Sequence, residues 1–418
     1  MNKQSFRFLW IGQSFANAGD ILYIVGLMAT IYAQTGAATY MALVPLCITM
    51  ARFVSSMIAP LLLDTYSLKK LLAYSQLGKT CLSLVLVLYA SMFLGTYPLI
   101  CLFLIVIGIA FLDGWASPAR NALIPQLVDH DQLIKANGFL SMVDEVIRLG
   151  GWAASGLVVA LIGSEAVLWL TVVLFIVSTV MMFWIDARHE QKEKVQYLSK
   201  RAVMKEGWVT IWQTPSLRLI SSVQLLEAIA NVVWIAAIVY VYVEQVLKVG
   251  EQWWGYINAS FALGCMVAGI ISLRYDRVVN RYLKAVILLG AFVASITTLS
   301  FGVLSKPWLA LILSFLFGVA SVVKGIAENT IIQTSVDDTK LSKVYAAQEA
   351  LLLGAFGTAT VMMGYVTDLY GARFSFTFAG VLLAVGAVSL MIGRNSLQIK
   401  GVESLQLQEA NDEVMIKS

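Results

Sequence analysis

Ten charged side chains lie inside long apolar runs of this chain, and they are the residues best suited to chemistry. A charged group at the centre of a lipid bilayer costs about 2.5–3.5 kcal/mol unless it is paired or hydrated. A carboxylate in a poorly hydrated cavity takes up a proton more readily than one in water, whereas a nearby arginine opposes that uptake. The set therefore favours reversible proton binding. Its members are Asp20, Arg52, Lys79, Asp113, Asp144, Glu145, Arg148, Glu227, Lys324 and Glu349.

Asp20, Arg52 and Glu227 lie near the middle of their runs, where a charge is hardest to hydrate. We predict that Asp20 or Glu227 binds the proton, with Asp113 and Glu145 as further candidates. Arg52 and Asp113 are expected to form a pair that tunes this equilibrium. A hydrogen bond between helices is the alternative role for Asp20 and for Glu227.

The other charged groups have a plainer interpretation, which is ionic pairing within a helix or at its end. Asp144 and Arg148 are four residues apart, and Glu145 and Arg148 are three apart, so each pair shares one helix face. Local pairing would satisfy all three. Four more groups are expected near the cytoplasmic helix ends, in gate pairs or with side chains that extend to the interface. They are Lys79, Lys324, Glu328 and Glu349.

Twelve apolar runs must position these groups, and they predict an all-α protein integral to a membrane. Hydrophobic residues make up 59% of the 418 residues and charged residues 13%, which is about half the charged share of a soluble domain. A helix satisfies its own backbone hydrogen bonds in lipid, so each run is expected to be one transmembrane helix. The predicted spans are 8–34, 39–63, 70–94, 97–118, 138–162, 165–186, 216–243, 252–274, 281–304, 307–328, 341–367 and 373–394.

A long polar stretch divides the runs six and six, which predicts two helical bundles and a linker. The N-terminal six-helix bundle is expected at 1–186, the linker at 187–215, the C-terminal six-helix bundle at 216–394 and a polar tail at 395–418. The two halves also resemble each other at an offset of roughly 208 to 212 residues, as in transporters built from two related bundles. At this offset Gln13 meets Gln224, Asp20 meets Asn231, and Asp64 meets Asp276.

Lysine and arginine are concentrated on one side of the predicted helices. The stretch from Arg188 to Lys205 adds to that side, whereas the other side carries Lys248, Lys306 and Arg373. Short cytoplasmic loops are enriched in these residues. Both termini and the linker are therefore expected in the cytoplasm. The net charge of +4 expresses this asymmetry, and we infer no nucleic-acid partner from it.

Cysteine and histidine are scarce, and neither has the spacing of a metal site, a redox pair or a catalytic set. A carrier of transition metals would place thiolate or imidazole ligands along its path. We therefore expect no cofactor, no metal site and no enzymatic activity. The residues concerned are Cys47, Cys81, Cys101, Cys265, His130 and His189.

Three stretches carry a resemblance to a known family. They are Phe8-Leu-Trp10-Ile-Gly12-Gln13 with Gly19-Asp20, Ser117-Pro118-Ala-Arg120-Asn121-Ala-Leu-Ile-Pro125-Gln-Leu-Val128, and Lys205-Glu206-Gly207-Trp208 with Pro215-Ser-Leu217-Arg218. In them the chain resembles the major facilitator superfamily, and within it the bacterial exporters that include macrolide-efflux and enterobactin-export proteins. The resemblance covers nearly the whole chain. It implies a transport path between two six-helix bundles in the bacterial cytoplasmic (inner) membrane.

The resemblance also implies a cytoplasmic gate. The loop motif between helices two and three of this superfamily survives in part as Asp64 and Lys69, and a second copy follows helix eight as Asp276-Arg277. With Arg120, these residues are expected to latch the cytoplasmic side, because a carboxylate there meets helix N-termini and neighbouring cations. For Lys69 the alternative is an ordinary basic residue of a cytoplasmic loop.

The fifth helix departs from the drug/proton antiporters of this superfamily. They carry Gly-Pro-x-x-Gly-Gly, a small-residue face that permits close helix packing. Here Gly151-Trp152-Ala-Ala-Ser155-Gly156 occupies the place, with Trp152 for the proline and Ser155 for a glycine. Export is therefore implied by the overall resemblance rather than by this signature.

The function that the resemblance implies is proton-coupled export of amphipathic small molecules such as drugs or macrolides. The protein would act as a monomer, by rocking of its two bundles, and proton coupling is expected mainly in the first six helices with Glu227 as the exception. Three alternatives stay open: a siderophore exporter, a lipid or lysolipid translocator, and a non-transporting sensor. The expected substrate-cavity residues are Gln13, Tyr23, Asn231 and Trp234.

Overall fold

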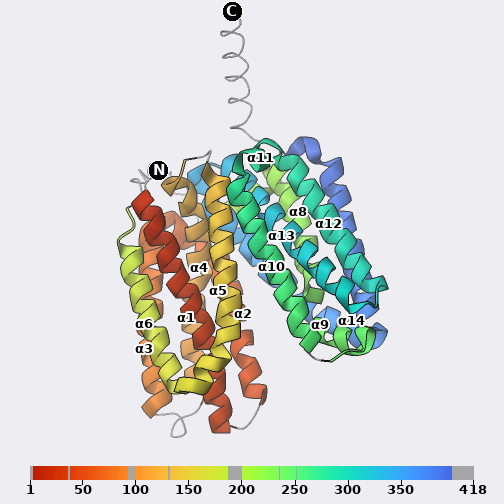
Figure 1. The fold of residues 1–418 in the computed structure, drawn as a ribbon. Helices are drawn as coiled ribbons and strands as arrows, with labels where there is room; N and C mark the ends of the chain where they lie inside the picture. The colour runs from red at the N-terminus through yellow and green to blue at the C-terminus, as the bar shows by residue number, and fades with distance from the viewer. Residues whose placement is uncertain are drawn as a thin grey trace, which may run out of the picture. The chain divides into compact units, whose positions relative to one another are not determined.

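The structure, a computed structural model, describes residues 3–35, 38–92, 99–129, 132–186, 200–234, 236–250 and 252–397 (Figure 1). Within these ranges every regular element is a helix. Parts of the predicted linker and tail, residues 187–199 and 398–418, lie outside the described residues, as do His130 and His189.

The chain forms two compact units, which are described separately below. Unit 1 comprises residues 1–129, 142–208 and 342–357. Unit 2 comprises residues 130–141, 209–341 and 358–418. Each unit therefore combines residues from both halves of the sequence.

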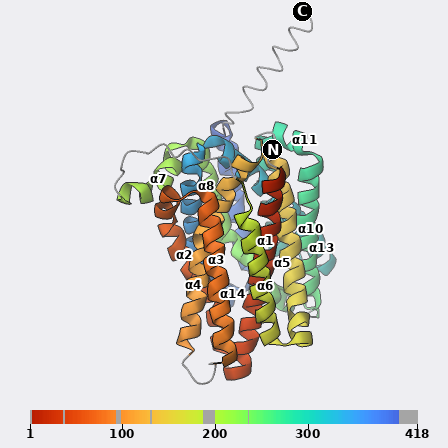
Figure 2. The same ribbon diagram turned by 90° about the vertical axis from the view of Figure 1, so that its left-hand side faces the viewer.

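The helices of the N-terminal half are long enough to cross a membrane, as their apolar composition predicts. α1 packs along α6 (Figures 1 and 2), while α4 packs on both α2 and α3. α5 is bent by 44° between its parts Leu133–Trp152 and Ala154–Ile162. The bounds are α1 (Lys3–Thr35), α2 (Ala38–Thr65), α3 (Leu68–Met92), α4 (Ile100–Leu127), α5 (Leu133–Ile162) and α6 (Ser164–Phe183).

The C-terminal half of the chain begins after the shorter helix α7 (Lys200–Gln213). One of its predicted membrane spans is interrupted, and two others form a single helix. The predicted span 216–243 leaves α-helical geometry at η2, a 3₁₀ segment, and ends in the π-helical turn η3. The predicted spans 341–367 and 373–394 are joined in α14 across a kink at Gly371, whose φ of 80° favours glycine. The bounds are α8 (Pro215–Ala230), η2 (Asn231–Trp234), α9 (Ala236–Tyr242), η3 (Val243–Leu247), α10 (Gln252–Arg274), α11 (Asp276–Arg281), α12 (Leu283–Val303), α13 (Pro307–Ser335), α14 (Asp338–Ile392) and η4 (Arg394–Ser396).

The predicted all-helical membrane fold is confirmed. Ten of the described helices, α14 among them, have the length and apolarity of a membrane span, and α5 adds an eleventh if its two bent parts count as one. The protein is therefore a multi-pass membrane protein.

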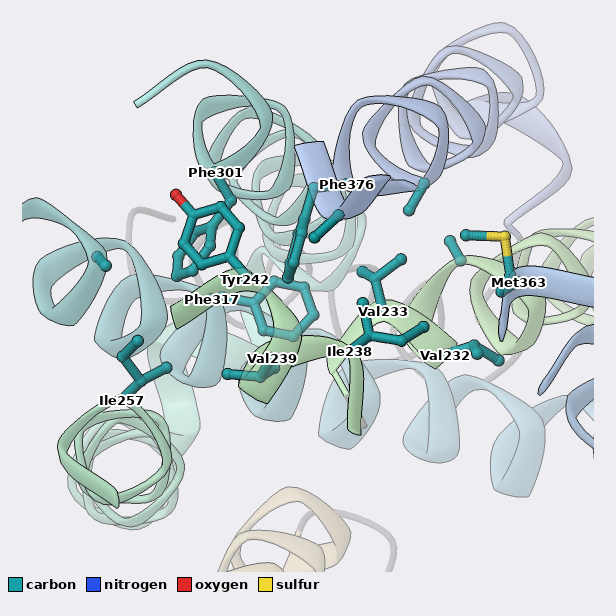
Figure 3. Packing of buried hydrophobic residues seen from close by; sticks show 14 of the residues in the cluster. Val232, Val233, Ile238, Val239, Tyr242, Ile257, Phe301, Phe317, Met363 and Phe376 are labelled. Carbon is teal, nitrogen blue, oxygen red and sulfur yellow. The ribbon is translucent and has the colours of Figure 1, made fainter. Parts of the chain in front are cut away.

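An aromatic cluster fills the core of unit 2. Tyr242 lies beside Phe301 and Phe376 (Figure 3), and its hydroxyl donates a hydrogen bond to the carbonyl of Leu304 at 2.7 Å. Phe317 stacks on Trp234 with ring centroids 4.3 Å apart. These rings come from α9, α12, α13, α14 and η2, so the cluster holds the interrupted helix against its neighbours.

Glycine allows two helices of unit 2 to cross backbone to backbone. A Cβ at Gly318 of α13 would overlap the Phe261 carbonyl oxygen, and one at Gly264 of α10 would overlap that of Phe315. By contrast, a Cβ at Gly325 of α13 would meet no atom within 4 Å. The contact between α10 and α13 thus depends on the missing side chains.

Gly318→Ala is expected to lower the free energy of unfolding by about 1–3 kcal/mol, because the added methyl group forces the two backbones apart. The matched control is Gly325→Ala in the same helix, where open space leaves only the gain of about 1 kcal/mol in helix propensity. Thermal unfolding of the detergent-solubilised protein measures both. Equal stabilisation by the two substitutions would contradict the close crossing.

Candidate functional site

A network of four charged groups joins four helices of unit 1. Lys79 of α3 lies between two carboxylates: its Nζ is 2.6 Å from Oδ1 of Asp20 in α1 and 2.8 Å from Oδ1 of Asp113 in α4. The other carboxylate oxygen of Asp113 pairs with Arg52 of α2. Two cations and two anions make this network neutral. We call these four residues the α1–α4 network.

The α1–α4 network decides between two expected roles of Lys79 and brings together the expected pair. Lys79 was expected in an ionic pair or with a side chain extending to the interface; its side chain is 2% exposed and is paired at the centre of the network. Arg52 and Asp113 do lie together, as the sequence suggested. Their role in proton binding stays a prediction.

A second group of charges lies in unit 2. Lys324 of α13 is 4% exposed, and its Nζ is 2.8 Å from Oε2 of Glu227 in α8 and 2.6 Å from Oε1 of Glu328, one turn further along α13. The Gln224 amide donates a hydrogen bond to the second oxygen of Glu328 at 3.1 Å. Of the two roles expected for Lys324, ionic pairing or extension to the interface, the structure shows pairing. We call Glu227, Lys324 and Glu328 the α8–α13 triad.

Asp144 pairs with a different helix from the one expected. Arg120 of α4 lies 3.1 Å from Asp144 in α5, and Asn17 of α1 donates a hydrogen bond to Asp144 at 2.8 Å. Gln13 continues this chain by donating to Asn17 at 2.8 Å. The ion-pair partner of Asp144 thus comes from another helix, and the role of Arg120 at the gate stays a prediction.

Glu145 and Arg148 do form the expected local pair, one turn apart on α5. Two guanidinium nitrogens of Arg148 donate to the two carboxylate oxygens of Glu145, at 2.6 Å and 3.0 Å. A carboxylate held by two such hydrogen bonds is satisfied as an ion. The geometry therefore favours a structural role for Glu145 over proton transfer, which stays a prediction.

Three of the expected cavity residues carry a buried polar atom that has no hydrogen-bond partner among the described residues. They are the hydroxyl of Tyr23, Oδ1 of Asn231 and Nε1 of Trp234. Tyr23 belongs to the apolar core of unit 1, and Trp234 packs in the aromatic cluster of unit 2. The rings of Tyr23 and Trp234 therefore pack in apolar cores. The buried polar atoms of all three residues could still form hydrogen bonds.

A lysine that the sequence did not single out for a role holds the predicted cytoplasmic end of unit 1 together. Lys343 of α14 pairs with Asp64 of α2, and its Nζ lies 2.6 Å from Oε2 of Glu206 in α7. Its side chain is 6% exposed. A Cβ at Gly207 would overlap the Lys343 carbonyl oxygen, so α7 and α14 meet closely here.

Three of the expected gate residues make no ion pair within the part of the chain that the structure describes: Lys69, Asp276 and Arg277. Asp276 and Arg277 begin α11 in unit 2, where Asp276 is half-buried and Arg277 is exposed. Lys69 is half-buried at the start of α3 in unit 1. Asp64, by contrast, pairs with a buried cation, Lys343.

Lys343→Ala is expected to weaken the docking of α7 on α14 by about 1.5–3 kcal/mol, because charge-assisted hydrogen bonds to two carboxylates are lost. Amide hydrogen exchange of residues 200–213 should become faster. Lys340→Ala is the matched control, since Lys340 is exposed one turn earlier on the same helix. The docking contact would be disproved by equal exchange rates in both variants.

Comparison with known proteins agrees with a transporter architecture. A sequence model of the Major Facilitator Superfamily matches residues 9–352. The chain is also 30% identical over 404 residues to YfmI, an MFS-type transporter of Bacillus subtilis (strain 168), which covers 96% of this chain and 98% of YfmI. The chain belongs to the major facilitator superfamily. Another relative in this superfamily, YjbB of the same organism, is 28% identical and covers 91% of this chain and 93% of YjbB.

Solved structures of transporters have the same major facilitator fold. A bacterial homologue of the iron transporter ferroportin, in an outward-facing state, gives a TM-score of 0.77 at 14% identity, covering 94% of this chain and 99% of that chain. The human organic anion transporter MFSD10 (TETRAN) gives a TM-score of 0.73 at 12% identity, covering 93% and 99%. At 14% and 12% sequence identity, the structural similarity shows a shared fold and does not identify the substrate of this chain.

Proposed function

We propose that this superfamily member is a proton-coupled exporter of amphipathic small molecules, such as drugs or macrolides, in the cytoplasmic (inner) membrane of a bacterium. Both termini lie in the cytoplasm, as the distribution of lysine and arginine indicates. The protein works as a monomer by alternating access. Export and the substrate class rest on the sequence resemblance.

The observation that supports proton coupling is a buried lysine held between two carboxylates in each unit. Lys79 and Lys324 are each shielded from solvent, while one carboxylate partner of each, Asp20 and Glu227, is about one-fifth exposed. Buried charges are expensive in a membrane protein and are retained where a protein moves ions or protons. A partly exposed carboxylate beside a buried cation can gain or lose a proton and thereby change that cation's contacts.

Transport by purified protein in liposomes tests this function. With ethidium and erythromycin as probes, an imposed pH gradient should drive each probe against the direction of proton flow, and a protonophore should abolish the accumulation. Protein-free liposomes are the control. Accumulation equal to that control with cationic, neutral and anionic probes would overturn the proposal. Transport confined to a siderophore or a lysolipid would replace the substrate class.

A further inference from the structure

The two groups of buried charge differ in their net charge. The α1–α4 network contains two carboxylates and two cations, whereas the α8–α13 triad contains two carboxylates and one cation. A buried charge without compensation is strongly unfavourable, so a site with one extra negative charge attracts a cation. One proton would make the triad neutral.

Within the triad, Glu227 is the carboxylate better placed to take that proton. Glu328 is 3% exposed and accepts hydrogen bonding from Gln224 in addition to its ion pair with Lys324. Those donors stabilise its ionised form. Glu227 is 19% exposed and has Lys324 as its ion-pair partner. A proton can reach Glu227 and meets fewer competing donors there.

Within the part of the chain that the structure describes, the charged groups that act on the Glu227 carboxyl group come from α13. Lys324 and Glu328 of α13 are the charges that act on its carboxyl group. The adjoining segment η2 contains no charged residue, and Arg394 of η4 lies near the opposite end of α8, where Gly393 meets Leu219. The environment of Glu227 is therefore set by the triad itself.

The helix that carries Glu227 is interrupted one turn later. α8 ends at Ala230, and residues Asn231–Trp234 form the 3₁₀ segment η2. Oδ1 of Asn231 is buried without a hydrogen-bond partner among the described residues. Residues four apart on a helix are neighbours, so this oxygen is a suitable acceptor for a protonated Glu227 carboxyl group. Short 3₁₀ segments inside longer helices often mark hinges.

We propose that the coupling proton binds Glu227 in the α8–α13 triad, and that this releases the Glu227–Lys324 link between α8 and α13. The proton forms an O–H bond with a carboxylate oxygen, and no other reactant is consumed. Lys324 then pairs with Glu328 on its own helix, while the hydrogen bonds Gln224–Glu328 and Ser216–Ser335 still join the two helices. The interrupted helix becomes free to move at η2. This inference rests on the proposed proton-coupled function.

Glu349 is the rival carboxyl group in unit 1. It lies near Arg52 and Ser117 and forms no ion pair among the described residues. Its protonation would therefore release no cation from a shared partner, which distinguishes it from Glu227. The α1–α4 network is expected to stay ionised and to hold its four helices together.

Infrared difference spectra of the purified protein, recorded between acidic and alkaline pH, test the inference without a substrate. The wild type should show the band of a buried protonated carboxyl group. Glu227→Gln should remove this band, whereas Asp20→Asn and Glu349→Gln should keep it. If Glu227→Gln does not fold, Glu227→Asp should shift the band instead. Loss of the band in Asp20→Asn or Glu349→Gln, with its retention in the Glu227 variants, would overturn the inference.

Transport in liposomes separates this inference from the proposed function. Glu227→Gln should keep exchange of ethidium across the membrane and lose proton-driven accumulation at least about tenfold, the change expected when about 1.4 kcal/mol of coupling is lost. Glu244→Gln is the matched control, because Glu244 is exposed later in the same membrane crossing. Full proton-driven accumulation in Glu227→Gln would overturn the inference and leave the proposed function intact. If the wild-type protein shows no proton-driven transport, the proposed function is overturned. The infrared band still shows whether Glu227 binds a proton.

Discussion

Replacement of Lys79 by methionine is expected to lower the free energy of unfolding by about 3–5 kcal/mol, because removal of one partner leaves a buried charge uncompensated. Lys79 is the shared cation of Asp20 and Asp113, and Arg52 would remain to pair with Asp113 alone. Thermal unfolding in detergent measures the loss. The matched control is Lys70→Met, since Lys70 is exposed at the start of the same helix.

A second substitution separates charge from shape in the α1–α4 network. Asp20→Asn in the Lys79→Met background leaves one carboxylate and one cation, so it should recover much of the lost stability. The double variant would stay as unstable as Lys79→Met if packing of the lysine side chain, rather than its charge, held the helices. Wild-type stability of Lys79→Met itself would contradict the network.

Lys324→Met should be at least as destabilising, by about 3–5 kcal/mol, because it leaves Glu227 and Glu328 together without their common cation. Adding Glu328→Gln should restore stability, since a single partly exposed carboxylate then remains. Thermal unfolding is again the measurement, with Lys306→Met as control because Lys306 is exposed at the beginning of α13. A Lys324→Met protein as stable as this control would show that the triad contributes nothing to folding.

The membrane helices could be predicted from the sequence, because lipid leaves the backbone no other way to satisfy its hydrogen bonds. The apolar composition therefore predicts an all-helical membrane fold. The interruption at Asn231–Trp234 could not be predicted in this way, since the segment contains neither proline nor glycine. It depends on the packing of Trp234 against Phe301 and Phe317, which come from distant parts of the chain.

The partners of the buried charges were harder to predict than their existence. Helical spacing correctly paired Glu145 with Arg148 because both lie on one helix, but the partner of Asp144 came from another helix. The two partners of Lys79 likewise come from other helices. One signal was available in the repeat: Asp113 and Lys324 share the offset that relates Asp20 to Asn231, so a carboxylate in one half corresponds to a lysine in the other.

The cytoplasmic gate illustrates a limit of family motifs. The motif positions Asp64 and Lys69 suggested a latch, but the cation that pairs with Asp64 is Lys343. Lys343 lies far along the sequence, and it also binds Glu206 of α7. Such a contact arises from tertiary packing, which spacing within one loop does not encode.

Proton movement driven by a substrate gradient tests the central claim most directly. Liposomes containing the purified protein are loaded with ethidium and a pH-sensitive dye and then diluted into buffer of the same pH without ethidium. Antiport predicts that ethidium efflux acidifies the lumen in the wild type and in Glu244→Gln, and that Glu227→Gln releases ethidium without acidification. Ethidium efflux from wild-type liposomes with a lumenal pH equal to that of protein-free liposomes would contradict proton-coupled export.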